Sequence, residues 1–412
     1  MLVTMRAVRC SLNFKLILIS KVISVVGGSI LGFVTLLFLV DFTQSAALLG
    51  MITMISQIPA IVIMPFAGMV ADRMNKKNLI VYLDIFAALI NFAFWGLLIT
   101  GSYTILNITI LQIVKVSVNT CATVVFNAAV PRIVDETQLV EANGAFESIR
   151  ALGFISGSLV GGLLFGLLSI KAIAFATGVL FLVSAGISSL IKIPYIKQEF
   201  VGNIVKIVKN DMSESFNFLR DEKPIVFKFS LITSVLACLF PPLFTIALPF
   251  IVTTVLDKPV AIPSGISAIG MLVGGMLAGR VKDYLTAQHF PRWLFALGAT
   301  CVPLVLIFTT FWVEFPISFL ILNVALTLLT LVFALLKSGM ASFAQKEIPK
   351  HLFGKIRSFQ TMIALISNTF GILVMGIFID IVPLPIFFVG LTAITWITAI
   401  VCNRILKRHL TN

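Results

Sequence analysis

Charged residues and histidines are scarce in this sequence, and their scarcity excludes most classes of soluble protein. Only 11% of the 412 residues are charged, whereas a soluble globular domain has about 25%. The three histidines and five cysteines show no paired spacing, so a metal cluster, a disulfide framework or a buried catalytic histidine is not expected. No Walker-type glycine loop occurs, which argues against ATP as the direct energy source. We therefore expect no enzyme, no cofactor and no metal site.

Apolar residues are abundant, at 59% of the chain, and the mean hydropathy is +1.10. One transmembrane helix needs roughly 20 of them, so the composition suffices for about twelve helices. The apolar runs are continuous, unlike the alternating pattern of barrel strands. We predict an all-α integral membrane protein with twelve transmembrane helices, at residues 14–40, 45–70, 78–100, 104–130, 142–168, 171–192, 226–253, 262–282, 291–312, 315–344, 357–380 and 384–404.

Lysines and arginines fall almost entirely in the connections on one side of these helices. The opposite side carries only Lys171 and Lys258. Connections rich in Lys and Arg stay in the cytoplasm, and an even number of helices then places both termini there. The net charge of +13 is explained by this topology, so we expect no nucleic-acid partner.

The polar stretch 193–225 divides the chain near its middle, and the two halves echo each other. Its apolar residues recur at near-helical spacing, which predicts an amphipathic helix along the membrane surface. We expect an N-terminal six-helix bundle over 1–192, a cytoplasmic linker over 193–225 and a C-terminal six-helix bundle over 226–412. Three landmarks recur at offsets of 211, 218 and 214 residues: Asp72 with Asp283, Pro131 with Pro349, and the helix breakers Gly27-Gly28 with Pro241-Pro242. Helix breakers at matching positions of two halves indicate a binding site near the bilayer midplane.

A glycine, an acid and a basic cluster follow one another between the second and third predicted helices. The stretch Gly68-Met-Val-Ala-Asp72-Arg73-Met-Asn75-Lys76-Lys77 resembles the loop signature G-x-x-x-D-R-x-G-R-[KR] of the major facilitator superfamily, with Asn75-Lys76 in place of Gly-Arg. The resemblance implies that Asp72 braces against the start of the eleventh helix, where the helix dipole favours an anion. It also implies a conformational latch made by Gly68, Asp72, Arg73, Lys76 and Lys77. The alternative is a solvated cluster of loop charges.

The fifth predicted helix carries glycines at a spacing of four. Gly153, Gly157, Gly161 and Gly162 resemble the antiporter-associated signature G-x-x-x-G-P-x-x-G-G, with Ser158 in place of Pro. Such glycines make a groove for close helix packing, which is the structural alternative to a functional role. The resemblance favours an exporter.

Two longer runs resemble the branch of this superfamily that contains macrolide-efflux and enterobactin-exporter-like proteins. Residues 127–143 fit the pattern P-x-L-V-x-x-x-x-L-x-x-A-N except at Ile133, and residues 348–358 fit P-x-x-x-x-G-R-x-x-S except at Lys355. The resemblance implies a monomer of two six-helix bundles in a bacterial cytoplasmic membrane. It further implies proton-coupled efflux of a hydrophobic or amphipathic compound, such as a macrolide-type antibiotic, by alternating access. The alternatives are a siderophore or metabolite exporter, an uptake permease, and a scaffold or sensor without transport.

Polar residues inside the apolar runs are the candidates for the substrate cavity. An ion at the bilayer centre costs at least about 2.5–3.5 kcal/mol, and Lys115 falls near the middle of the fourth predicted helix, close to Gln112 and Asn119. We expect these three residues to line the cavity. A structural contact between helices is the alternative.

The carboxylates closest to the helix interiors are the candidates for proton coupling. Asp41 lies at the outer end of the first predicted helix, while Asp84 and Glu147 lie in the inner portions of the third and fifth. We expect Glu147 to pair with Arg150 one turn away, and Asp84 to pair with Arg73 or Lys77.

Overall fold

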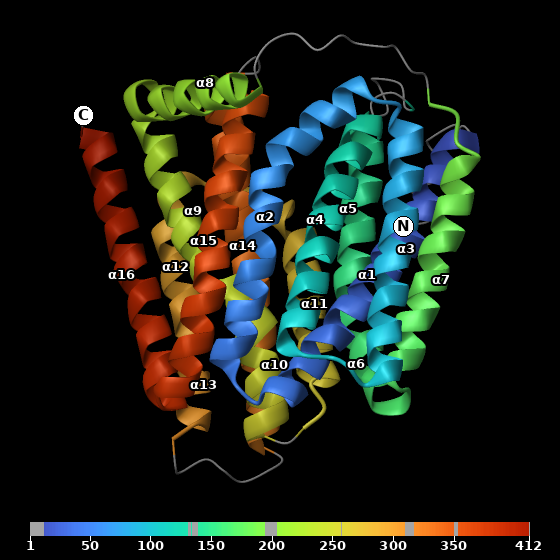
Figure 1. The fold of residues 1–412 in the computed structure, drawn as a ribbon. Coiled ribbons are helices and arrows are strands. Elements are labelled where there is room, and N and C mark those ends of the chain that lie inside the picture. Colours follow the sequence, from blue (N-terminus) through green and yellow to red (C-terminus); the bar gives the residue numbers. More distant parts are fainter. Residues whose placement is uncertain are drawn as a thin grey trace. The chain divides into compact units, whose positions relative to one another are not determined.

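The computed structural model describes residues 12–130, 133, 139–193, 204–256, 258–309, 317–349 and 353–411. These residues form helices and no strand (Figure 1), which confirms the all-α prediction. Twelve of the helices in the described ranges are long and apolar enough to cross a membrane, which confirms the predicted number.

The first half of the chain supplies six of these spans. Its helices are α1 (Leu12–Thr43), α2 (Ala46–Arg73), α3 (Lys76–Thr100), α4 (Ile105–Ala129), α5 (Leu139–Ile155), α6 (Gly161–Leu167) and α7 (Ile170–Ser189). A π-helical turn, Ser156–Val160, joins α5 to α6, so these two helices form one span with a local widening.

The second half supplies the other six spans. Its helices are α8 (Ile204–Asn217), α9 (Pro224–Pro242), α10 (Leu248–Phe250), α11 (Ala261–Ala278), α12 (Phe290–Ala299), α13 (Val302–Ile307), α14 (Ile317–Glu347), α15 (Phe353–Ile381) and α16 (Leu384–Thr411). π-Helical turns at Leu243–Ala247 and Ile251–Val255 join α9 and α10 into one span that ends at Val255.

The chain divides into two compact units. Unit 1 comprises Met1–Phe42 and Ile52–Ile204, and unit 2 comprises Thr43–Met51 and Val205–Asn412. The start of α2 therefore belongs to unit 2, although the rest of that helix belongs to unit 1. The sequence pattern placed this short segment in the N-terminal bundle.

The same helix pairs meet within each unit. In unit 1 the first span approaches the fifth, where Gly157 faces the backbone of Ser29, and α3 packs along α7. In unit 2 the first span, α9, packs along the fifth, α15, and the third span, α12, packs along the sixth, α16. This repetition of first-with-fifth and third-with-sixth pairs agrees with the duplicated landmarks of the sequence.

The paired helix breakers behave differently in the two units. The prediction that Gly27-Gly28 interrupt the first span is wrong, because α1 is continuous from Leu12 to Thr43. Gly27 and Gly28 instead lie against Leu180 and Phe181 of α7, so their lack of a side chain serves packing. Pro241 and Pro242 lie inside α9, directly before a π-helical turn, as expected where proline removes backbone donors.

Helix α8 lies within the predicted linker, residues 193–225, and its end packs on other helices of unit 2. Its apolar side chains were expected on the membrane surface. Phe216, which is 37% exposed, also meets the ring of Phe227 in α9 at 5.6 Å and that of Phe359 in α15 at 6.3 Å between centroids. Leu219, one turn later, is fully buried. This end of the amphipathic helix therefore packs on protein as well as presenting polar residues to solvent.

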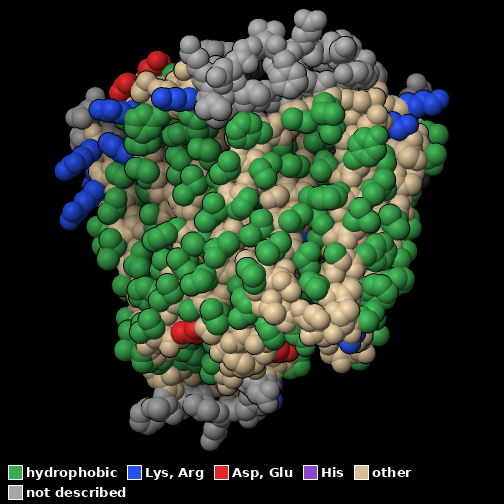
Figure 2. Space-filling model, viewed as in Figure 1, with side chains coloured by type: hydrophobic (Ala, Val, Ile, Leu, Met, Phe, Trp, Pro, Cys, Tyr) green, Lys and Arg blue, Asp and Glu red, His purple; other side chains and the backbone are tan. Residues whose placement is uncertain are grey.

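Large apolar side chains are exposed along most of the helices, such as Leu106, Leu163, Met276 and Phe370. Figure 2 shows hydrophobic side chains over the middle of the helices on one face, with Lys, Arg, Asp and Glu near the helix ends. Such a surface requires lipid rather than water around it, which fits the twelve spans.

Candidate functional site

A cavity of about 510 Å³ lies within unit 1. This volume is in the range of sites that hold drug-sized ligands. The cavity is partly open and is lined by residues of α1, α3, α4 and α5, with Phe181 of α7 on one side. Lining residues recur on each helix at intervals of three and four, which is the spacing of one helix face.

The lining face of α4 carries Gln112, Lys115 and Asn119, the three residues expected there from the sequence. They are three and four positions apart, so they lie above one another on one face. A small adjoining void of about 10 Å³ also contacts Gln112 and Lys115. The ammonium of Lys115 forms no hydrogen bond or ion pair with any residue that the structure describes.

Asp84 of α3 is a buried carboxylate on the cavity lining. The hydroxyl of Ser184 in α7 donates to its Oδ2 at 2.7 Å and also lies 3.1 Å from the carbonyl oxygen of Ser20 in α1. The hydroxyl thus ties three helices together around the carboxylate. Asp84 was expected to pair with Arg73 or Lys77. Among the described residues its hydrogen-bond partner is Ser184. The Arg73 side chain lies outside the described residues.

Lys21 of α1 is a cation that interacts electrostatically with Asp84. Its ammonium lies 4.5 Å from the centroid of the Phe126 ring, and it interacts electrostatically with Asp84 and Arg150. A cation over an aromatic face is attracted by the ring. The side chains of Lys21 and Asp84 therefore offset each other's charge within the lining.

Asn91 is a lining residue that the sequence analysis missed. It lies in α3 two turns after Asp84, is 2% exposed, and its Nδ2 has no hydrogen-bond partner among the described residues. Buried polar groups without partners are rare. The Asn91 amide is therefore a donor on the lining that is available to an acceptor. The available signal was a polar residue in an apolar run at a spacing of seven from Asp84.

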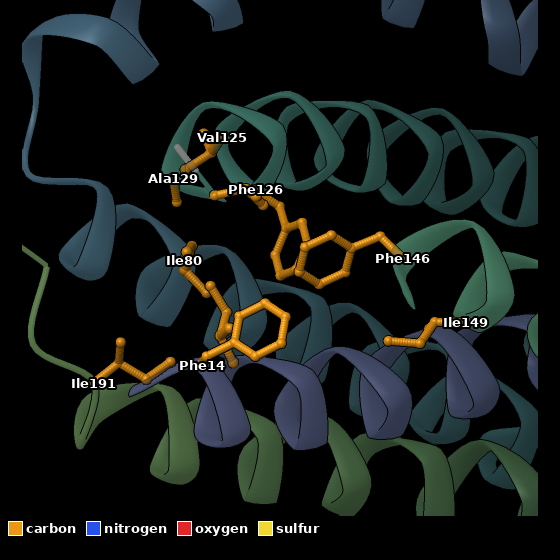
Figure 3. Close-up of a cluster of buried hydrophobic side chains, with 10 residues drawn as sticks. Phe14, Ile80, Val125, Phe126, Ala129, Phe146, Ile149 and Ile191 are labelled. Atoms are coloured by element: carbon orange, nitrogen blue, oxygen red, sulfur yellow. The ribbon is translucent and has the colours of Figure 1, made fainter. Parts of the chain in front are cut away.

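An aromatic cluster forms one end of the cavity. Figure 3 shows Phe126 of α4 and Phe146 of α5 facing Phe14 of α1. The Phe126 and Phe146 rings meet edge to face at 4.7 Å between centroids, and Phe14 meets Phe146 at 6.1 Å. Phe126, Phe146 and Ile149 also line the cavity, so a buried apolar cluster (Figure 3) closes it at this end.

The glycines of the fifth span lie against α1. A Cβ at Gly153 would lie 2.5 Å from Val25 Cγ1, one at Gly157 would lie 2.9 Å from the Ser29 carbonyl oxygen, and one at Gly161 would lie 3.2 Å from that of Ile30. Val25 and Ser29 line the cavity, so these glycines set the position of one cavity wall. Gly162 follows in α6 and is partly buried.

The predicted latch lies largely beyond the described side chains. Gly68, Asp72 and Arg73 fall within α2, but their surroundings lie outside the described residues, as does the Glu147 side chain in α5. Lys76 is buried and Lys77 is partly buried.

Asn75 caps α3, since its Oδ1 accepts from the backbone N–H of Lys77 at 3.0 Å and of Asn78 at 3.4 Å. This cap explains Asn at a position where the resemblance expects Gly.

The other predicted carboxylate, Asp41, is exposed near the end of α1 and is not on the cavity lining.

A carboxylate that the sequence analysis missed, Asp380 of α15, lies in unit 2. It accepts from Ser45 Oγ at 2.6 Å and from the backbone N–H groups of Ala46 and Ala47 at 3.0 and 2.9 Å. Asp380 thereby caps the start of α2, where backbone donors have no partner within the helix.

Comparisons with known proteins agree on the family and the fold. The family model described as Major Facilitator Superfamily matches residues 17–372. Macrolide efflux protein A of Streptococcus pyogenes is 24% identical over 407 residues, which are 96% of each chain. A protein of the same name from Enterococcus faecalis is 29% identical over 247 residues, 58% of this chain and 74% of that protein.

Solved structures share the fold across the chain. The nucleoside transporter NupG superimposes with a TM-score of 0.70 at 15% identity, over 96% of this chain and all of that one. A bacterial homologue of the iron transporter ferroportin, in an inward-facing state, gives a TM-score of 0.68 at 16% identity over 97% and 99%. At these identities the likeness concerns the fold.

Proposed function

The chain belongs to the major facilitator superfamily, as a multi-pass membrane transporter and not an enzyme, and we propose that it exports hydrophobic or amphipathic compounds by alternating access. The efflux proteins to which it is similar along 96% of its length support the direction of transport. Macrolide-type antibiotics are therefore the first cargo to test.

The observation that carries this proposal is the unit 1 cavity. It combines an aromatic end, formed by Phe126 and Phe146, with the polar face of Gln112, Lys115 and Asn119. A molecule with one apolar and one polar part can satisfy both surfaces at once, because apolar area gains by leaving water while buried polar groups need partners.

Proton coupling is proposed for Asp84. Of the three carboxylates expected from the sequence, Asp84 is buried on the lining beside Lys21 and Ser184. Binding a proton would remove the charge that offsets Lys21, so the protonated and ionised states of this residue favour different arrangements of α1, α3 and α7. Such a difference between two states is what coupling requires.

The proposed setting is the bacterial cytoplasmic membrane, with both termini in the cytoplasm and one chain acting as a monomer. Support comes from the lysines and arginines of the connections, which follow the rule for cytoplasmic loops. The predicted latch of Gly68, Asp72, Arg73, Lys76 and Lys77 would then lie at the cytoplasmic face.

Accumulation assays test the proposal. Bacteria that overproduce the chain are loaded with a panel of uncharged, cationic and acidic amphipathic compounds, including erythromycin, with and without an uncoupler. We expect lower accumulation of at least one compound than in vector cells, and equal accumulation once the uncoupler is added. Higher accumulation in energised cells would identify an uptake permease instead. No difference for any compound would favour a scaffold or sensor.

A further inference from the structure

We propose that the unit 1 cavity binds the acidic group of its substrate, so that the preferred cargo is a small amphipathic anion such as a carboxylate. This proposal rests on the proposed function, in which the cavity holds the transported molecule. It names the chemical class of that molecule from the hydrogen-bonding groups of the lining.

Lys115 supplies the positive charge for this recognition. Its side chain reaches both the main cavity and the small adjoining void, and its ammonium has no partner among the described residues. An ammonium offers three donors and no acceptor. An unpaired cation inside a membrane protein is costly, and a bound anion would offset that cost.

Asn91 supplies a second unused donor beside Lys115. Both residues line the main cavity and the adjoining void, so their side chains border the same space from α3 and α4. The Nδ2 of Asn91 is buried without a partner. Two unused donors that border one space, one of them charged, suit the two oxygens of a carboxylate.

The remaining charged groups of the described lining do not favour a cation. Asp84 accepts from Ser184 and is offset by Lys21, so its charge is already compensated inside unit 1. Arg150, another charged residue of that lining, is also a cation and has an interaction of its own. A cationic ligand would therefore meet repulsion from Lys115 without a free carboxylate to bind.

The apolar part of the ligand has a place beside the edge of Phe126 and Phe146, with Phe181 on the side of α7. These rings offer apolar contact, and the ammonium of Lys21 already lies over the face of Phe126. The lining thus combines aromatic rings with the unused donors of Lys115 and Asn91, which favours an amphipathic acid over a fully polar anion.

Binding of matched probes to the purified full-length protein in phosphatidylcholine nanodiscs tests the proposal. One set comprises radiolabelled cholate, its methyl ester and the analogue with a primary amine in place of the carboxylate. A second set comprises dodecanoate, methyl dodecanoate and dodecylamine. We expect the acid of at least one set to bind about tenfold or more tightly than its amine, a difference that corresponds to about 1.4 kcal/mol.

Variants assign this preference to the two donors. Lys115→Gln is expected to lower acid affinity about tenfold and to leave amine affinity unchanged or raised, whereas Lys115→Arg keeps the acid preference. Asn91→Leu is expected to lower acid affinity several-fold. Lys171→Gln is the matched control, because it removes the same charge from an exposed residue at the start of α7 that is not on the lining. Equal elution volumes and unfolding temperatures confirm that each variant is folded.

Two outcomes would overturn the proposal: no acid preference in either set, including no acid binding at all, or an acid preference that Lys115→Gln leaves intact. The accumulation assay separates this failure from failure of the proposed function. Export of uncharged or cationic compounds without acid preference leaves efflux standing and removes the anion site. Lys115-dependent acid binding without export in cells leaves the site standing and removes efflux.

Discussion

At the scale of single residues, the position of Asp84 depends on one short hydrogen bond. The hydroxyl of Ser184 donates to it at 2.7 Å, and Lys21 is the nearby cation. Replacing the carboxylate by an amide keeps the shape of the side chain and removes the titratable group, so it separates a structural role from a role in coupling.

Asp84→Asn is expected to abolish the response of transport to an imposed pH gradient while retaining exchange of substrate across the membrane, because exchange needs no net proton movement. Transport is measured in proteoliposomes with and without a pH gradient. Asp221→Asn is the control, since that carboxylate is exposed in unit 2. Full pH-driven transport by Asp84→Asn would assign coupling to another residue.

Asn75→Ala is expected to destabilise the start of α3 by about 1 kcal/mol, the usual cost of losing an N-cap. The lost contacts are those with the N–H groups of Lys77 and Asn78. Thermal unfolding in detergent measures the effect. Asn78→Ala, three residues later and exposed, is expected to change the unfolding temperature less; an equal change for both would argue against the cap.

Some site residues could be predicted from the sequence and others could not, for physical reasons. Gln112, Lys115 and Asn119 were recognisable because polar residues inside an apolar run at helical spacing must share a face. Ser184 was not, since its partner Asp84 is 100 residues away and small hydroxyl residues occur throughout membrane helices. Asn91 was overlooked although its spacing from Asp84 placed it on the same face. Asp380 resembled an ordinary charge at a helix end.

At the scale of helices, the prolines of α9 lie close to the point where a glycine of α15 packs against that helix. Proline lacks the N–H that would bond to the carbonyl four residues earlier, so Pro242 leaves the carbonyl of Cys238 without its usual donor. That carbonyl lies against Gly371, where a Cβ would collide with it. The sequence pattern located Pro241 and Pro242 as helix breakers, but it could not show that Gly371 of α15 lies against the carbonyl of Cys238.

Gly371→Ala is expected to destabilise unit 2 by about 2 kcal/mol, the range for overpacking a buried contact. The added methyl group would push α15 away from α9. The unfolding temperature in detergent checks this expectation. Gly390→Ala provides the matched control in α16, where nothing lies within 4 Å of the added Cβ. Similar unfolding temperatures for the two variants would contradict the close approach.

At the scale of the whole molecule, the twelve spans could be predicted because each is a continuous apolar run of helix length, and the structure confirms that number among the described residues. The boundary between the two units was harder to predict from the sequence. Residues 43–51 belong with the second half, and Asp380 contacts their backbone more than 330 residues along the chain. Local sequence patterns carry no signal for such a contact.

Asp380→Ala is expected to loosen the first turn of α2, because the N–H groups of Ala46 and Ala47 lose their acceptor. The expected cost is about 1 kcal/mol, as for other helix N-terminal carboxylates. Hydrogen exchange of residues 45–50, followed by mass spectrometry, should be faster than in the wild type. Asp283→Ala, an exposed carboxylate elsewhere in unit 2, should leave this exchange unchanged. Unaltered exchange in Asp380→Ala would mean that the cap does not stabilise the turn.

Because α2 is a single helix of 28 residues, it is a stiff rod roughly 40 Å long. Its first residues belong to unit 2 and the remainder to unit 1. One continuous helix therefore contains residues of both units, and the carboxylate of Asp380 caps the end that belongs to unit 2.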